Sequence, residues 1–151
     1  MQVEFVDCEE CVALVSRATC GHAELGPVIT GLFQKLIEAN PDATLVSYPR
    51  VYYTQWEKET CTVEAAFPVE PTTVPGGETQ LKTYPGGRAV MATHVGPYDT
   101  MSVTWMALWE WVSENKQQPA QAPPWDVYVT DPGQEPDPLK WVTELYIPLE
   151  G

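Results

Sequence analysis

An internal repeat is the feature that most constrains what this chain can fold into. Similar residues recur in the two halves in the same order and at a nearly constant separation. The matched pairs are Val12 with Val90, Tyr52 with Tyr128, Glu64 with Glu144, and Pro68 with Pro148. A repeat of this length predicts two copies of one small structural unit.

Each half is expected to form a strand, a helix and two further strands. The predicted strands are runs of β-branched and aromatic residues bounded by Pro, Gly or Asp. They cover residues 11–15, 48–54, 62–69, 89–94, 125–130 and 143–149. Residues 24–38 and 98–115 are predicted helices, because apolar residues recur there on one helical face. Those faces hold Leu25, Val28, Leu32 and Leu36, and then Met101, Trp105, Leu108 and Val112.

Residues 1–151 are expected to form one α+β domain. Repeat one covers about residues 3–70, an irregular Pro- and Gly-rich link covers about 71–87, and repeat two covers about 88–150. Another Pro-rich stretch, residues 131–138, is expected to join the last two strands as a long-looped hairpin. Helices can cover one face of each small sheet, so the other faces are expected to border a ligand cleft between the pseudo-symmetric repeats.

The charge of the chain narrows its choice of partners. Lys and Arg total 8 while Asp and Glu total 21, for a formal net charge of −13. Such a field repels phosphate backbones, so we expect no nucleic-acid binding by this chain alone. It attracts cationic ligands or a basic protein surface, although charge also serves solubility alone. The sequence identifies no particular protein partner.

The sequence carries no sign of a membrane protein or of a cofactor enzyme. No stretch reaches the ~20 apolar residues of a membrane span, and the N-terminus lacks a signal-peptide pattern, so a cytoplasmic protein is expected. No nucleophile elbow, Walker loop or dinucleotide-binding glycine motif appears, and no cofactor is predicted. Cys8 and Cys11 form a C-x-x-C pair without a second pair at zinc spacing. Reduced thiols are expected there, with a zinc or redox site as the alternative.

The second half resembles the GyrI-like effector-binding family. The resemblance rests on the order and spacing of several short motifs, and the repeat extends it over nearly the whole chain. The motifs are Leu81 with 85–87 (PGG), 94–98 (HVGPY), Leu108 with Trp111, 125–128 (WDVY) with Asp131 and Pro132, and 143–149 (TELYIPL).

The resemblance implies a SOUL/GyrI-like fold and a pocket lined by aromatic side chains around a carboxylate. The family includes ligand-sensing domains of multidrug-responsive activators, a gyrase inhibitor and stand-alone domains. Some stand-alone members are similar to hydrolases of cyclopropane-bearing natural products. With no residues left over for a DNA-binding domain, this chain resembles a stand-alone member.

Strand alternation selects the candidate site residues. Asp126 and Tyr128 share one strand face, as do Glu144 and Tyr146 on the next strand, and we expect both sets to face the cleft. The family usually has Glu at the position of Asp126. The shorter Asp side chain reaches less far, which favours Glu144 as the ligand carboxylate.

The repeat and the helix add further candidates. Tyr52 is the expected counterpart of Tyr128, and Glu64 is that of Glu144. Aromatic residues on the second helix serve either the core or the ligand site. The full set of candidate ligand-binding residues is Glu144, Tyr128, Asp126, Tyr146, Trp141, Tyr52, Glu64, Tyr98, Trp105 and Trp109.

Three functions remain open on these residues. The first is a stand-alone receptor or sequestering protein for amphipathic aromatic cations. The second is a hydrolase of strained electrophilic small molecules, with Glu144 as general base and Tyr128 or Tyr146 stabilising developing charge. The third is a protein-interaction module that uses the acidic surface as a decoy for basic partners.

Overall fold

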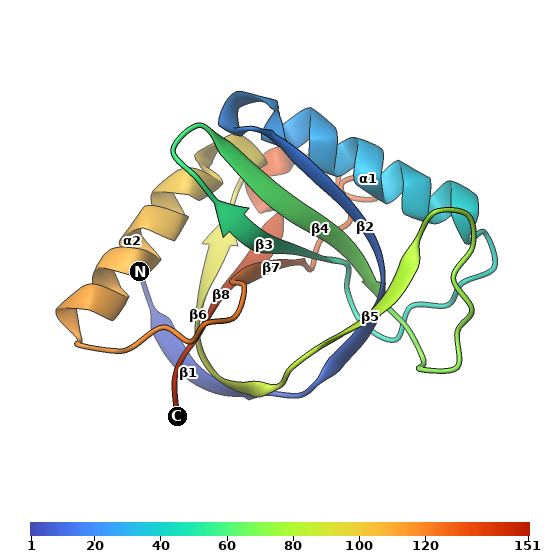
Figure 1. Cartoon of the computed structure of the whole chain (residues 1–151). Helices are drawn as coiled ribbons and strands as arrows, with labels where there is room; N and C mark the ends of the chain where they lie inside the picture. The colour runs from blue at the N-terminus through green and yellow to red at the C-terminus, as the bar shows by residue number, and fades with distance from the viewer. The chain divides into compact units, whose positions relative to one another are not determined.

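A computed structural model describes all residues, 1–151 (Figure 1). The chain forms two compact units. Unit 1 contains residues 1–9 and 86–151, and unit 2 contains residues 10–85. Each unit combines antiparallel strands with one α-helix, which confirms the predicted α+β class. Neither α-helix is long and apolar enough to cross a membrane.

Unit 2 is built on a sheet with the strand order β3-β4-β2-β5. Its elements are β2 (Cys11–Gly21), a 3-10 turn η1 (His22–Glu24), α1 (Leu25–Ala39), β3 (Arg50–Trp56), β4 (Thr60–Pro68) and β5 (Gln80–Tyr84). Helix α1 packs along β2 and β4, as Figure 1 shows, and buries Leu32 and Leu36. Phe33 stacks on Phe67 of β4, so the side chains that share the face of Phe67 lie toward the helix.

Unit 1 repeats this plan with the strand order β1-β6-β8-β7. Its elements are β1 (Val3–Cys8), β6 (Gly87–Val95), η2 (Tyr98–Thr100), α2 (Met101–Glu114), β7 (Trp125–Tyr128), η3 (Pro138–Lys140) and β8 (Val142–Pro148). The core between α2 and the sheet contains Leu108 and Val112 of the helix with Val90, Leu145 and Ile147 of the strands. Strands β7 and β8 form the long-looped hairpin that the sequence predicts.

Two strands depart from the expected boundaries. Residues 3–8 fall in the expected range of repeat one, where no strand was predicted for them, yet they form β1, which pairs with β6 in the unit that holds repeat two. Strand β5 lies inside the stretch 71–87 that we expected to be irregular, and it pairs with β2. The two added strands occupy equivalent edges of their sheets, so each unit contains one more strand than each predicted repeat.

The end of α1 is fastened to the segment that leads into β5. The side chain of Asn40 donates to Leu36 O and to Thr79 Oγ1, and its Oδ1 accepts from Gly76 N at 2.8 Å. A Cβ at Gly76 would lie 2.0 Å from the carbonyl oxygen of Ala39. Only glycine therefore lets the backbone approach the helix end this closely.

Candidate functional site

The face of the unit 1 sheet turned away from α2 carries a carboxylate beside a ring stack. Glu144 of β8 is half-buried, and the Tyr146 hydroxyl donates to its Oε1 at 2.9 Å. Tyr146 stacks in parallel on Trp125, with ring centroids 4.9 Å apart and an interplanar angle of 3°. These residues lie opposite the core because Leu145 and Ile147, which alternate with them along β8, pack against α2.

The corresponding face of unit 2 carries the same kind of group. Glu64 of β4 is 3% exposed, and the Tyr84 hydroxyl donates to its Oε1 at 2.6 Å. Tyr84 stacks in parallel on Tyr52, with centroids 3.5 Å apart and an interplanar angle of 2°. Burial raises the pKa of both tyrosines, and the Glu64 carboxylate raises the pKa of Tyr84 further. Both hydroxyls therefore stay protonated.

The two glutamates occupy equivalent positions in their sheets. Glu64 pairs with Arg17 of β2 and with Tyr52 of β3. Glu144 pairs with Thr93 of β6 and with Val127 of β7.

The charge around the two glutamates differs. Lys82 Nζ lies 2.7 Å from Glu64 Oε1 and 2.9 Å from Oε2. In the β1–β6 ladder, Val6 pairs with Ala89 as Lys82 pairs with Ala13 in the β5–β2 ladder, so Val6 takes the place of Lys82 in unit 1. The Glu144 carboxylate accepts a hydrogen bond from the Tyr146 hydroxyl.

The expectation that Asp126 and Tyr128 share a face with Glu144 is wrong. Asp126 pairs with Leu145, and Tyr128 pairs with Thr143, so both lie on the side of the sheet that α2 covers. Asp126 is fully buried there. The counterpart of Tyr52 is consequently Val127 rather than Tyr128, because each of these two is the β-partner of its unit's glutamate.

Tyr128 belongs to an aromatic cluster on the α2 side of unit 1. The ring of Tyr98 meets Tyr128 edge-on at 5.4 Å and lies 4.9 Å from Trp141, whose indole Nε1 donates to Glu135 O. Burial raises the pKa of Tyr98 to about 12, with smaller contributions from the charges of Asp126 and Asp131. The predicted site residues of β7 and β8 thus fall into two groups on opposite faces of the unit 1 sheet.

The aromatic residues of α2 lie on the opposite side of the unit 1 sheet from Glu144. Trp105 is partly buried and packs against the unit 1 core, and Trp109 is 41% exposed on α2. His94 is held by Thr104 Oγ1 at 2.7 Å and by the carbonyl oxygen of Pro97 at 3.0 Å, an arrangement that orients the turn before α2. No group of three or more His, Cys, Asp or Glu side chains is placed to hold a metal ion.

Sequence reasoning missed three residues of the two faces. Trp125 was overlooked because the wrong face was assigned to its neighbour Asp126. Tyr84 and Lys82 were overlooked because their strand, β5, lies in the stretch interpreted as an irregular link. The alternation of Leu81 with Lys82, Thr83 and Tyr84 between turn residues was the signal available for β5.

Comparison with known proteins gives one family match. The model of a family described as the GyrI-like small molecule binding domain matches residues 1–150. No curated protein matches the chain.

Solved structures share the fold at low sequence identity. The C-terminal domain of EcmrR is 24% identical, with a TM-score of 0.83 and 99% of this chain and 97% of that one covered. In a complex of EcmrR with DNA, the likeness has a TM-score of 0.84 at 24% identity and covers 99% of this chain but 57% of that chain. This chain therefore spans little more than half the length of that protein.

Two structures with lower sequence identity are a protein bound to a ligand and a hydrolase. SAV2435 bound to tetraphenylphosphonium is 12% identical, with a TM-score of 0.67 and coverage of 100% of this chain and 95% of that one. A hydrolase from Listeria innocua is 13% identical, with a TM-score of 0.60 and coverage of 99% and 92%. At these identities the likeness establishes the fold alone.

Proposed function

Because the chain belongs to the GyrI-like small-molecule-binding family, we propose that it binds aromatic, cationic, amphipathic molecules as a multidrug-type receptor or sequestering module. The observation that carries this proposal is Glu144 beside the Trp125–Tyr146 stack. The Tyr146 hydroxyl holds one carboxylate oxygen in place, and the second oxygen can pair with a ligand cation. The aromatic surface of Tyr146 lies next to it.

Electrostatics supports a cation over a neutral ligand. A cation over an aromatic face gains about 0.5–2 kcal/mol, depending on how far it is desolvated. A half-buried carboxylate adds a charge interaction that a neutral ligand of the same shape does not have. The bound tetraphenylphosphonium of SAV2435, a protein with the same fold, is an aromatic cation and supports the same ligand class.

A titration with a matched ligand pair tests the proposal. N-methylacridinium is a flat cation, and acridine is its neutral counterpart at a pH where its ring nitrogen is unprotonated. The chain should bind the cation more tightly, and Glu144→Gln should weaken cation binding by about tenfold while leaving acridine binding unchanged. The control Glu110→Gln removes the same charge from an exposed site on α2 and should bind like the unaltered protein.

Two results would contradict this function. One is equal affinity of the unaltered protein for the cation and for acridine. The other is equal loss of cation affinity in Glu144→Gln and Glu110→Gln, since this would assign the effect to net charge rather than to the site.

A hydrolase of strained electrophiles is the alternative activity. The hydrolase of the same fold is compatible with it, but the geometry of this chain gives it less support than binding. Tyr128 lies on the opposite sheet face from Glu144, and Tyr146 donates a hydrogen bond to the carboxylate that would act as base. Mass analysis of a cyclopropane-bearing electrophile incubated with the protein decides: water addition that Glu144→Gln abolishes would establish the activity.

A further inference from the structure

Glu64 already holds a cation that the chain itself supplies. Its carboxylate is nearly inaccessible, yet both oxygens contact the ammonium group of Lys82, at 2.7 and 2.9 Å. The same ammonium lies 5.0 Å from the centroid of the Tyr84 ring. A carboxylate beside an aromatic ring is the pairing by which proteins hold organic cations, so Lys82 sits where a ligand cation would sit.

The two partners of this ion pair are held very differently. The Glu64 side chain is 4% exposed and is fixed by the Tyr84 hydroxyl, whereas the Lys82 side chain is 43% exposed. Lys82 also belongs to β5, the edge strand of the unit 2 sheet. A lysine has a flexible four-carbon stem and regains hydration when its ammonium moves outward, but the buried carboxylate cannot follow it. Of the two, Lys82 is therefore the partner that can leave.

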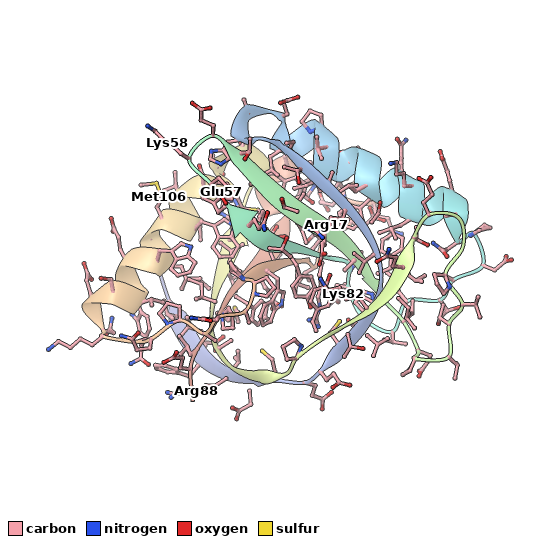
Figure 2. The ribbon with its side chains drawn as sticks, in the orientation of Figure 1. Arg17, Glu57, Lys58, Lys82, Arg88 and Met106 are labelled. Carbon is pink, nitrogen blue, oxygen red and sulfur yellow. The ribbon has the colours of Figure 1, made fainter.

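A buried carboxylate needs a cation whenever Lys82 leaves. Unpaired, Glu64 would bear the full desolvation cost of a buried charge. Arg17 pairs with Glu64 in the β2–β4 ladder and is exposed, so it is one cation that can approach the carboxylate. Arg50 lies on the same sheet face and donates to the Tyr52 hydroxyl at 3.0 Å. Figure 2 shows Arg17 and Lys82 on the side of the unit 2 sheet turned away from α1.

We infer that Lys82 is a displaceable internal counter-ion, and that the Glu64–Tyr84 pair of unit 2 is a second cation site from which it excludes weak ligands. This inference rests on the proposed function, in which aromatic cations are the ligands. Lys82 then sets the minimum binding strength that a ligand needs at Glu64. A ligand binds at Glu64 only if its own charge and ring contacts exceed those of the ammonium group. Unit 1, with Val6 in the equivalent place, sets no such minimum.

Removing the ammonium while keeping the stem tests the inference. Lys82→Met should bind N-methylacridinium about tenfold more tightly at a second site than the unaltered protein does. Lys58→Met removes the same charge from an exposed turn of unit 2 and should leave binding unchanged. The combination with Glu64→Gln should abolish the gain.

Chemical labelling gives a second readout in the unaltered protein. Saturation with N-methylacridinium should raise the rate at which Lys82 is acetylated by acetic anhydride, while that of Lys58 stays constant. No gain in Lys82→Met together with unchanged Lys82 acetylation would overturn the inference. Failure of the proposed function would give a different result, namely cation affinity that does not change in Glu144→Gln. The two results are distinguishable because Glu144 and Lys82 lie in different units.

Discussion

Tyr84, Tyr52 and Tyr98 are tyrosines whose hydroxyls the fold keeps neutral. Burial raises the pKa of each above its ordinary value of about 10. A raised folded-state pKa means that the folded protein retains the proton more strongly than the unfolded chain. The stability from these protonated hydroxyls is complete below about pH 10, and it is lost as the pH rises through the folded-state values.

Tyr98→Phe separates this effect from general alkaline unfolding. The substitution keeps the ring contacts with Tyr128 and Trp141 but removes the hydroxyl that titrates. Its free energy of unfolding should fall less steeply between about pH 10 and 12 than that of the unaltered protein. Urea unfolding across this range, with tyrosinate absorbance recorded in parallel, measures both quantities, and identical slopes would refute the assignment.

Gly31 and Gly76 differ in whether the elements around them leave space for a side chain. A Cβ at Gly31, inside α1, meets nothing within 4 Å, while one at Gly76 strikes the carbonyl of Ala39. Gly31→Ala should stabilise the protein by up to about 1 kcal/mol, because alanine restricts the unfolded chain and favours helix. Gly76→Ala should destabilise it by about 1–3 kcal/mol, since the helix end must shift. Thermal unfolding of the two variants should move in opposite directions, and a shared direction would contradict this reasoning.

Most of the helices and strands could be predicted from the sequence. Both helices follow from apolar periodicity, and the strands beside them follow from runs of β-branched and aromatic residues. They lie within a few residues of the predicted bounds, except that β2 continues to Gly21 where we expected the strand to end at residue 15. Strands β1 and β5 were not predicted, because each is an edge strand of its unit and its partner, β6 or β2, lies far from it in the sequence. Their positions depend on long-range hydrogen bonding, which leaves little trace in local composition.

The candidate site was predictable only in part, for a related reason. Glu64 and Glu144 were correctly matched across the repeat, but Tyr52 was matched to Tyr128 instead of Val127. Side chains alternate faces along a strand, so an error of one residue moves a side chain to the other side of the sheet. Equivalent residues of the two units are identified by their hydrogen-bonded partners in the sheet, and not by similarity between two aromatic side chains.

At the level of the whole molecule, the net charge of −13 should act on ligand capture over distance. Fixed charges are felt over a Debye length of about 30 Å at 0.01 M salt and about 8 Å at 0.15 M. The association rate of N-methylacridinium should therefore fall several-fold across this range, while that of acridine should stay constant. Stopped-flow fluorescence measures both rates, and equal salt dependence of the two ligands would exclude electrostatic steering.

Unit 1 is built from two separate segments of the chain, so the two units cannot be separated by a single cut. Strand β1 precedes all of unit 2 along the chain but completes the sheet of unit 1 by pairing with β6. A fragment that starts at residue 86 would lack this strand and present the bare hydrogen-bonding edge of β6, a template for aggregation. A stable fragment of the second repeat will need residues 1–9 joined to it, for example after residue 151 through a flexible linker.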